Sequence, residues 1–500
     1  MVIKSTGKPP KQRSVYRLSG VSQPTEFGVH NNNLCNLRRG LLERVYYVEG
    51  RSGLQPPPQP EPGRFAEVFD KFVDALSPHL PSAAPCTADE FVSMYDGDRR
   101  RKVYAAAAES LVSKPVSRDD ARLSTFVKAE KINFTAKVDP APRVIQPRGP
   151  RYNVEVGRYL KRLEKPIYKA IEGLYGEPTV LKGYNAGESG RLLRAKWDQY
   201  DKPVAIGLDA SRFDQHCSEA ALKAEHSVYL KCFRGKDRKR LATLLSWQLR
   251  NRGIGRANDG LIKYTVNGCR MSGDMNTALG NCLLMSGMVW ALLDELGVKG
   301  SLANNGDDCV VIMESRDLTR FQAAVELWFL RLGFTMKVEE PVYVFEQIEF
   351  CQTKPVWGPH GWVMCRKGLV AMAKDSVSVL PLSDRGAAQR WAAAIGNCGM
   401  ALAGGLPIFQ EYYQALLSAA GNAADWKHPA LESGFARLAS GMHHKYGPIS
   451  AATRISFWEA FGVLPSEQEW IETRLRDAQV HFGIHRRDKF NDFSFLSTTW

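Results

Sequence analysis

Three aspartates in two short stretches of this 500-residue chain have the residue type and spacing needed for metal chemistry. Asp307 and Asp308 are adjacent in "NNGDDCVVIM", and Asp209 ends the apolar stretch "VAIGLD". Adjacent carboxylates repel and raise each other's pKa unless a cation neutralises them, and carboxylate oxygens are the ligands that Mg²⁺ prefers. The alternative for Gly306-Asp307-Asp308 is an ordinary surface turn, because Asn-Gly and Gly-Asp sequences favour turns.

Both stretches predict strands that would position these carboxylates. In "KPVAIGLDASRFD", Val204, Ile206 and Leu208 alternate with smaller residues, which predicts a strand with one apolar face and Asp209 at its end. "SLANN" and "CVVIM" flank the Gly306-Asp307-Asp308 turn and predict a hairpin with the carboxylates at its tip. Asp214 follows Asp209 by five residues, past the end of the first strand.

A predicted helix supplies further polar residues. In "CRMSGDMNTALGNCLLMSGMVWALLDELG", Ser272 and Gly273 mark a loop, and an apolar helix follows. Thr277 and Asn281 are four residues apart and share one helical face. Polar side chains on an otherwise buried helix need a partner, which is either structural or a ligand. For Thr277, helix capping or packing is the alternative.

The charge of the chain points to a polyanionic partner. The net charge is +14 and the sequence pI is about 9.2, which indicates nucleic acid or an acidic membrane, or else simply a soluble basic protein. Prolines at 140, 142, 147 and 150 prevent a continuous helix over residues 120–165, so cations there should lie on extended strands and turns. Such an arrangement suits a channel that grips phosphates; the cations are Lys128, Lys131, Lys137, Arg143, Arg148 and Arg151.

Composition excludes several other classes of protein. With 44% hydrophobic and 24% charged residues, the chain can bury a large core in several subdomains. The ten cysteines form no C-x-x-C pair, which argues against a zinc ribbon and for free thiols in a reducing compartment. The basic N-terminus is not a secretory signal, and the longest apolar stretch, Cys282 to Leu293, is too short to span a bilayer. We interpret that stretch as a buried helix.

The order of these pieces resembles the palm of viral RNA-dependent RNA polymerases. "DASRFD" resembles motif A, "SGDMNTALGN" motif B and "GDD" motif C of that family. "FCQTKPV" resembles motif E, and the basic block from Lys128 to Arg151 resembles motif F. "FGVHNNNLCNLRRGL" and "GPISAATRISFWEAFGVLPSEQ" are similar to the polymerases of tombusvirus-like plant viruses (Tombusviridae), so the resemblance covers most of the chain.

The resemblance implies an α+β fold with the shape of a right hand, in which fingers and a helical thumb surround a palm built on an antiparallel sheet. Residues 1–64 would form a basic N-terminal extension and linker, and 65–200 the fingers with the motif F region. Residues 201–370 would form the palm, with a fingers insertion at about 216–265. Residues 371–500 would form the helical thumb and C-terminal tail.

The resemblance also implies a two-metal phosphoryl transfer with Mg²⁺, for which Mn²⁺ can substitute. Asp209 and Asp307 would be the bridging ligands, Asp308 an auxiliary one, and the backbone carbonyl of Ala210 a further one. Lys337 in "FTMKVEE" is the candidate general acid that protonates pyrophosphate, with a plain surface lysine as the alternative.

Nucleotide-binding residues follow from the same motifs. The positions of Asp214, Ser272, Thr277 and Asn281 read the ribose 2′-hydroxyl in the family, where buried polar groups reject a sugar that lacks it. Arg143 matches the arginine that contacts the triphosphate, with Lys128 and Lys131 assisting.

The implied activity is replication and transcription of a positive-strand RNA virus genome by addition of ribonucleotides to RNA 3′ ends. Implied partners are the single-stranded RNA template, nascent RNA, ribonucleoside triphosphates, and an auxiliary replicase protein or N-terminal segment that provides membrane attachment. The expected location is the host cytoplasm, at membrane-bound replication sites. We further expect initiation without a primer, with the aromatic-rich tail "HFGIHRRDKFNDFSFLSTTW" as a stacking platform.

Two other functions stay open at this stage. A reverse transcriptase shares the palm, although Asp214, Asn281 and Gly306 favour ribonucleotides. A non-catalytic RNA-binding replication scaffold would explain the charge, but it gives no reason for three motifs in register.

Overall fold

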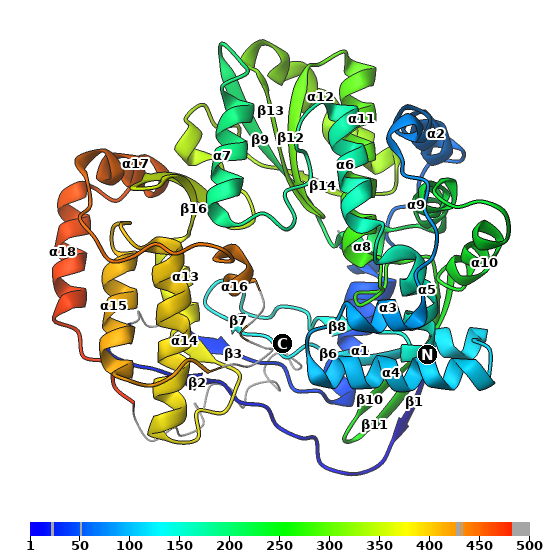
Figure 1. Cartoon of the computed structure of the whole chain (residues 1–500), viewed down its shortest axis with the longest axis horizontal. Coiled ribbons are helices and arrows are strands. Elements are labelled where there is room, and N and C mark those ends of the chain that lie inside the picture. Colours follow the sequence, from blue (N-terminus) through cyan, green and yellow to red (C-terminus); the bar gives the residue numbers. More distant parts are fainter. Residues whose placement is uncertain (22–24, 51–52, 427–430, 432–433, 483–500) are drawn as a thin grey trace.

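The computed structural model of the chain describes residues 1–21, 25–50, 53–426, 431 and 434–482 (Figure 1). The predicted mixture of helices and mainly antiparallel strands is confirmed. The tail from residue 483 onward, which we expected to act as a stacking platform, lies outside the described residues.

A four-stranded sheet carries the predicted carboxylates, with the strand order β12-β13-β9-β14. The predicted hairpin is confirmed as β12 and β13, and the strand that ends near Asp209 is β9, which pairs with both β13 and β14. Only one face of β9 was predicted to be apolar, but both are covered, because Ile206 packs into one core and Ala205 into another. The strands are Gly300–Asn305 (β12), Asp308–Glu314 (β13), Pro203–Ala210 (β9) and Met336–Val338 (β14).

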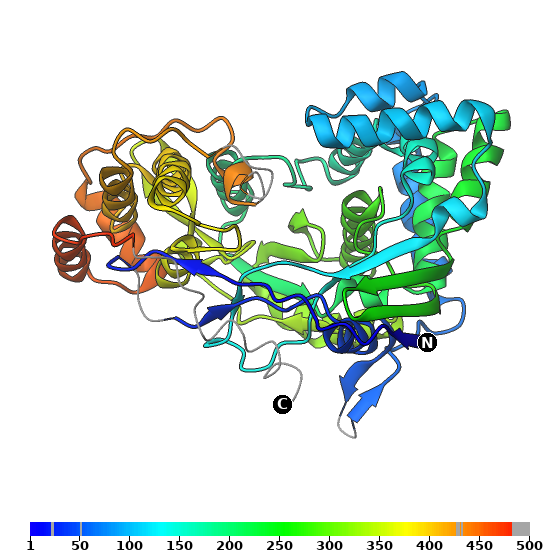
Figure 2. The same cartoon turned by 90° about the horizontal axis from the view of Figure 1, so that it is seen from below.

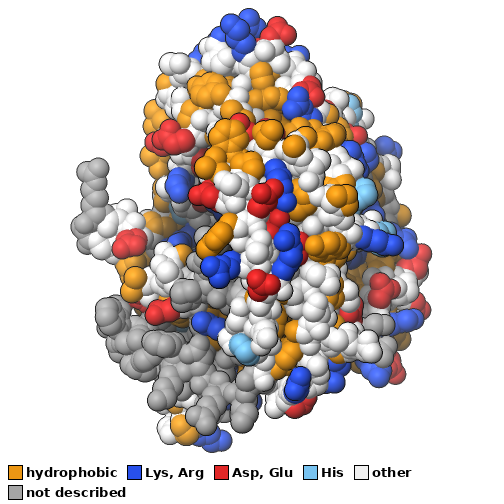
Figure 3. Space-filling view, turned by 90° about the vertical axis from the view of Figure 1, so that its left-hand side faces the viewer, with side chains coloured by type: hydrophobic (Ala, Val, Ile, Leu, Met, Phe, Trp, Pro, Cys, Tyr) orange, Lys and Arg blue, Asp and Glu red, His pale blue; other side chains and the backbone are white. Residues whose placement is uncertain are grey.

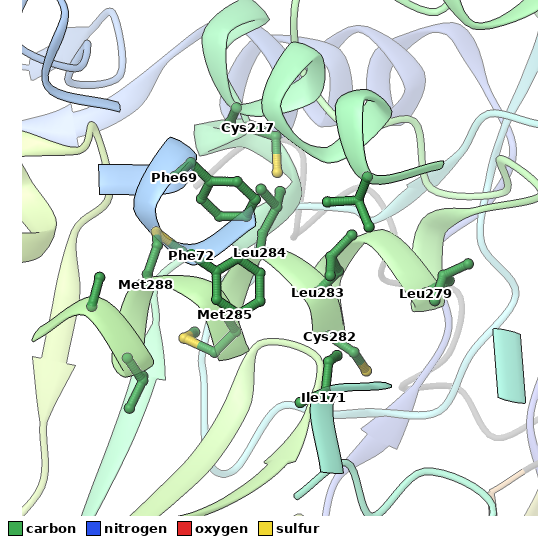
Figure 4. Close-up of a cluster of buried hydrophobic side chains, with 14 of the residues drawn as sticks. Phe69, Phe72, Ile171, Cys217, Leu279, Cys282, Leu283, Leu284, Met285 and Met288 are labelled. Atoms are coloured by element: carbon green, nitrogen blue, oxygen red, sulfur yellow. The ribbon is translucent and has the colours of Figure 1, made fainter. Parts of the chain in front are cut away.

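The first core packs helices around α11 (Thr277–Leu296), the predicted buried helix (Figure 4). Figure 4 shows Phe69 and Phe72 of α2 stacked against the apolar side chains of α11. A Cβ at Gly287 would meet both rings at 2.8 Å, so this glycine lets the two helices approach closely. The neighbouring helices are α2 (Arg64–Leu76), α6 (Glu164–Tyr175), α9 (Glu219–Lys231) and α12 (Leu318–Arg331).

Helix α11 is also the one described helix long and apolar enough to cross a membrane, but 78% of its most apolar window is buried inside the protein. All ten cysteines lie in the described part of the chain and are unpaired, as predicted.

The second core joins the other face of the sheet to the C-terminal helices, which lie on the left in Figure 1. The stretch that resembles motif E leads into a hairpin of β15 (Thr353–Gly358) and β16 (Gly361–Arg366), and β16 packs against α7 (Ala186–Trp197). The following helices are α13 (Gly368–Asp375), α14 (Arg385–Ala403), α15 (Phe409–Ala420), α16 (Phe435–Leu438), α17 (Ala451–Phe461) and α18 (Pro465–Arg476).

A five-stranded sheet, which the sequence did not predict, lies at the lower right of Figure 1 in the order β1-β11-β10-β6-β8. Figure 2 shows the hairpin of β10 and β11 (green) next to the N-terminal strand. Helix α1 (Leu34–Leu41) covers one face, and Gly255 admits the side chain of Leu37. The strands are Val2–Ser5 (β1), Gly260–Asn267 (β11), Arg250–Ala257 (β10), Leu123–Val127 (β6) and Val144–Ile145 (β8).

Part of the basic block is helical, contrary to the expectation of strands and turns. Pro150 occupies the first turn of α5 (Pro150–Leu160), where its missing amide proton costs nothing. Arg151 is therefore helical and pairs with Asp120 at 2.9 Å, whereas Arg148 is buried and pairs with Asp274 at 2.5 Å. Both arginines are structural. The remaining described helices are α3 (Ala88–Ser93), α4 (Asp98–Ser113), α8 (Phe213–His216) and α10 (Gly235–Ser246), with 3₁₀ turns η2 (Ser77–His79), η3 (Arg118–Ala121), η4 (Ser315–Asp317) and η5 (Phe345–Gln347).

The N-terminal segment connects distant parts of the fold. Besides β1, it supplies β2 (Tyr16–Arg17), which pairs with β17 (Val377–Ser378), and β3 (Phe27–Gly28), which pairs with β7 (Ile132–Asn133). It also contains the π-helical turn η1 (Leu42–Tyr46) and the hairpin of β4 (Val48–Gly50) and β5 (Gly53–Gln55). Residues 1–64 thus contribute strands to several sheets as well as a proline-rich connection to α2.

Candidate active site

A row of polar residues crosses the four-stranded sheet at one end. Asn305, Asp308, Asp209 and Lys337 are successive direct partners on β12, β13, β9 and β14. Direct partners in antiparallel strands share a face, with Cβ atoms roughly 4.5–5.5 Å apart. The pairing therefore brings together two predicted metal ligands and the candidate general acid, which are separated by up to 128 positions in the sequence.

The turn that precedes β13 is held by Asn304, whose buried side chain contacts both sides of Gly306. The Asn304 amide donates to the Gly306 carbonyl at 2.8 Å, and its carbonyl oxygen accepts from the Gly306 N–H at 3.2 Å. Gly306 has a φ of +91°, which favours glycine. The turn leaves the side chain of Asp307 open to the cavity described below.

The carboxylates of this turn have perturbed pKa values. Burial raises the pKa of Asp308 to about 6, with a further contribution from the charge of Asp307. Burial among the cavity walls likewise raises the pKa of Asp307, and Asp209 adds to this while Arg143 opposes it. Mutual repulsion of this kind is relieved by a cation.

Cys351, in the predicted motif E, contacts Asp308 directly. Its thiol and backbone N–H lie next to the Asp308 carboxylate and oppose the rise of its pKa, and the Asn305 amide contacts the Cys351 sulfur at 3.2 Å. Cys351 and Gln352 both have positive φ, 52° and 60°, in the tight turn before β15. Asp308 thus has Asp209 of β9 as its strand partner on one side, and the turn at Cys351 lies on the side of Asn305 and β12.

The carboxylate oxygens of Asp209, Asp307 and Asp308 are the type of ligand that a hard divalent cation prefers, but the three side chains do not converge on a single position. Within the described ranges, no group of three or more His, Cys, Asp or Glu side chains is close enough to hold a metal ion. Asp209 and Asp307 are close enough to interact electrostatically, and Asp209 contributes to the raised pKa of Asp307. The oxygen-only donors and the repulsion at Asp307 and Asp308 fit a site for such a cation.

A cavity of about 330 Å³ collects six of the predicted site residues. Its walls come from β8, the segment around α8, the loop before α11, α11 itself and the turn at Gly306. The six residues are Arg143, Asp214, Ser272, Thr277, Asn281 and Asp307.

Asp214 and Asn281 are hydrogen-bonded to each other across this cavity wall. The Asn281 amide donates to an Asp214 carboxylate oxygen at 2.8 Å, and the Asn281 carbonyl oxygen accepts from Arg270 at 3.1 Å. Burial raises the pKa of Asp214, and these contacts oppose that rise. Arg270 is fully buried and forms an ion pair with the buried Glu225.

The polar network continues behind Arg270 and fixes its position. Glu225 accepts from Tyr229 and from Asn276, both at 2.7 Å, and Asn276 accepts from Gln248 at 2.9 Å. These hydrogen bonds hold Glu225 and Arg270 in place, although the buried Nη1 of Arg270 has no hydrogen-bond partner in the described residues. Neither Arg270 nor Glu225 was predicted as a site residue, because their contacts join α9 to the loop before α11.

Thr277 and Ser272 lie in the same cavity wall with structural contacts of their own. The Thr277 hydroxyl donates to the Met271 carbonyl at 3.0 Å, which is a structural contact but not a helix cap, since the N-cap of α11 is Asn276. Thr277 also lines the cavity. The Ser272 carbonyl accepts from the Gln146 N–H at 2.7 Å, which ties the loop to the segment after β8.

Three arginines surround the opening next to the carboxylates, and two of them were not predicted. Arg44, Arg143 and Arg212 line both the first cavity and an adjoining one of about 870 Å³, which also reaches Asp209 and Ala210. Burial lowers the pKa of Arg44 to about 10, and the charges of Arg212 and Arg143 lower it further. A cluster of cations that repel one another is a site for a polyanion.

The two lysines predicted to assist Arg143 lie outside these cavity walls. Lys128 pairs with Glu130 at 2.8 Å, the same carboxylate that Arg143 contacts at 3.3 Å. Lys131 donates to the Lys374 carbonyl at 2.8 Å and lies over the ring of Trp391, so it contacts the C-terminal helices. Burial lowers its pKa to about 8.

Comparison with known proteins decides the family. The sequence model described as "Viral RNA dependent RNA polymerase" matches residues 1–483. The chain belongs to this family. It is 48% identical over 481 residues to the RNA-directed RNA polymerase of Turnip crinkle virus, covering 94% of this chain and 61% of the relative. The corresponding protein of Tobacco necrosis virus (strain A) is 46% identical, covering 94% of this chain and 65% of the relative.

The relatives confirm the resemblance to plant-virus polymerases of the Tombusviridae. The protein of Carnation mottle virus is 44% identical, over 97% of this chain and 63% of its own length. The chain thus spans about three fifths to two thirds of the length of these relatives. Members of the family are generally dependent on divalent metal ions, and the reverse transcriptase alternative is not favoured.

Proposed function

We propose that this chain is an RNA-directed RNA polymerase that replicates and transcribes the genome of a positive-strand plant RNA virus. The observation that carries the proposal is the register that pairs Asp209 with Asp308, next to a cavity lined by Asp307, Asp214 and Asn281. The carboxylates that would bind metal ions thus lie next to the polar side chains that would bind a ribose.

The carboxylates are proposed to hold the metal ions of the reaction. Asp209 and Asp307, with the backbone carbonyl of Ala210, would hold two Mg²⁺ ions, for which Mn²⁺ can substitute, and Asp308 would assist. When bound, such ions activate the RNA 3′-hydroxyl and neutralise charge on the phosphates. Cys351 orients Asp308 through the thiol and backbone contacts described above.

The cavity wall is proposed to select ribonucleotides. Asn281 is fixed by Arg270 and Asp214, which leaves a rigid polar surface for the ribose 2′-hydroxyl, with Ser272 and Thr277 beside it. A deoxyribose would leave these groups unpaired, and buried unpaired polar groups are costly.

The arginine cluster is proposed to bind the triphosphate. Arg143 offers a planar fork that suits phosphate oxygens, and Arg44 and Arg212 add charge around the same opening. Lys128 would add charge once Glu130 is displaced from it, whereas the contacts of Lys131 with the C-terminal helices favour a connecting role. Lys337, next to Asp209, would protonate the leaving pyrophosphate.

The fold is proposed to be a right hand. The four-stranded sheet with α11 and α12 would be the palm, within residues 201–370, with the 216–265 insertion joining the fingers of residues 65–200. The C-terminal helices within 371–500 would be the thumb. The strands supplied by residues 1–64 pair with both β7 and β17, which would connect fingers and thumb.

The partners follow from this function. They are a single-stranded RNA template, the nascent strand, ribonucleoside triphosphates, and an auxiliary replicase protein or further segment that gives membrane attachment at replication sites in the host cytoplasm. We also propose initiation without a primer.

The test is RNA synthesis by the purified chain on an unlabelled RNA template with Mg²⁺. The proposal expects template-length product with four ribonucleoside triphosphates and none with the four deoxyribonucleoside triphosphates. A preference for the deoxyribonucleotides would instead indicate a reverse transcriptase. If the chain binds RNA but makes no product with either set, even with membranes and auxiliary protein added, the scaffold function would replace this one.

A further inference from the structure

The five-stranded sheet is covered on one face only. Helix α1 and the buried side chains of Leu123, Ile262 and Tyr264 fill its inner face. The opposite, outer face carries Arg250, Arg252 and Arg256 from β10, because alternate residues of a strand point to the same side. The register adds Lys263 of β11, Lys4 of β1 and Phe126 of β6 to this outer face.

The strands of this outer face contribute basic side chains and no acidic ones. In the part of the chain that the structure describes, no carboxylate forms an ion pair with Arg250, Arg252 or Arg256. Elsewhere the two charges are mixed, as Figure 3 shows for the side that carries α17 and α18, where Arg454 pairs with Glu472 at 2.9 Å. The strands of the outer face thus carry positive charge only.

Besides its positive charge, this outer face has a cavity next to Arg250 and Arg252 and an exposed aromatic ring, Phe126. Arg250 and Arg252 line a cavity of about 330 Å³ together with Arg118, Arg122, Trp247 and the buried Arg148. Asp119 also lines this cavity and pairs with Arg122 at 2.8 Å. Phe126 is 40% exposed, which is unusual for a phenylalanine with an apolar core directly behind its strand. Exposed aromatic rings among cations are the surface on which single-stranded RNA bases stack.

The outer face leads to the catalytic cavity. Phe126 pairs with Ile145 of β8, and the Lys128 N–H donates to the Arg143 carbonyl at 2.8 Å, so Arg143 continues the same face. Arg143 also lines the cavity with Asp307 and Asn281. The face therefore begins at the site of nucleotide addition and extends across the sheet toward β1.

We propose that the outer face of the five-stranded sheet binds the unpaired, single-stranded RNA template before it reaches the catalytic cavity. Phe126 stacks on a base, and Arg250 and Arg252 hold phosphates in the adjoining cavity. The identification of the RNA as template rests on the proposed polymerase function; RNA binding itself is measured without nucleotides, so the two can fail separately.

The first test is equilibrium binding of a fluorescent 20-nucleotide oligouridylate to the full chain at several salt concentrations. The double variant Arg250→Gln/Arg252→Gln should reduce the slope of log K against log salt by about 1.4, because each lost phosphate contact on a single strand removes about 0.7. The matched control Arg316→Gln/Arg320→Gln removes two arginines at η4 and α12, and it should leave the slope unchanged. Equal slopes for both double variants would overturn the proposal.

The second test concerns the aromatic ring. Phe126→Ala should weaken oligouridylate binding about 5- to 150-fold with an unchanged salt slope, as expected for one lost stacking contact, and Phe126→Tyr should bind like the wild type. Because Phe126→Ala could also loosen β6, Phe126→Leu keeps the apolar bulk and should still bind weakly. Wild-type binding by Phe126→Leu would contradict stacking.

The third test separates template from any other RNA. The arginine double variant should weaken binding of a hairpin RNA with ten unpaired 5′ nucleotides and leave binding of the same hairpin with one unpaired nucleotide unchanged. Equal weakening of both would place the contact on duplex RNA and overturn the template assignment. If these binding results hold while the wild type incorporates no nucleotide, the polymerase function fails and the single-strand site stands.

Discussion

Asp209 and Asp308 are direct partners in the antiparallel register of β9 and β13, and Lys337 is the direct partner of Asp209 on its other side. These catalytic candidates thus lie at the end of a sheet whose two faces are covered by separate buried cores. Rigid strands place ligands more accurately than loops.

The carboxylates should differ in importance. Asp209→Asn should lower nucleotide incorporation by about 10³-fold or more, because it removes a ligand from both ions. Asp308→Asn, an auxiliary ligand, should retain measurable activity. Single-turnover extension of a primed template over a range of Mg²⁺ concentrations checks this, and an Asp308→Asn loss as complete as that of Asp209→Asn would contradict the assignment.

Cys351 should act through Asp308. Cys351→Ala removes the thiol contact and should lower kcat while the KM for nucleotides and the affinity for RNA stay near normal. Cys351→Ser keeps a donor and should recover most of the loss. Cys35→Ala, at an exposed cysteine, is the control. Equal kcat for Cys351→Ala and wild type would show that the contact has no part in catalysis.

Asn281 should govern the choice of sugar. Asn281→Ala should reduce the preference for UTP over dUTP about 10- to 100-fold, since a hydrogen bond in a charged network contributes roughly 1.5–3 kcal/mol. The ratio of kcat/KM for the two nucleotides measures it. Asn305→Ala, on the same cavity wall but without a contact to Asp214, is the control. An unchanged ratio in Asn281→Ala would rule out the ribose role.

Arg143 should bind the triphosphate. Arg143→Ala should raise the KM for UTP about 10- to 100-fold, and Arg143→Lys should restore only part of it, because lysine keeps the charge but loses the fork. Arg44→Gln should raise the same KM, whereas Lys131→Gln should not, since Lys131 contacts the C-terminal helices. Steady-state kinetics on one template compare the four variants. A normal KM for UTP in Arg143→Ala would show that Arg143 does not bind the triphosphate.

The sequence could predict those parts of the site that depend on local pattern. Alternation of Val204, Ile206 and Leu208 located β9, and the Gly306 turn between apolar stretches located the hairpin. The buried helix from Thr277 followed from its apolar length. Each of these features is set by residues close together in the chain.

Contacts between segments that are far apart in the sequence could not be predicted from it. Arg44 lies in a π-helical turn that no pattern marks, and this turn meets Arg212, which donates to the Glu43 carbonyl, only because residues 1–64 fold back onto the centre of the molecule. The five-stranded sheet was missed for the same reason, since β1 and β11 are about 260 positions apart in the sequence. Lys131 shows the reverse case, in which a residue within a matched motif faces another part of the fold.

The most direct measurement of the central claim is labelled UTP incorporation on a defined RNA template with Mg²⁺, comparing wild type with Asp307→Asn at equal RNA occupancy. Asp307→Asn removes one charge from a side chain that is open to the cavity, so RNA binding should be unchanged. The account predicts template-length product from the wild type and none from Asp307→Asn. Equal product from both would contradict the assignment of the Gly306-Asp307-Asp308 turn as the metal-binding centre.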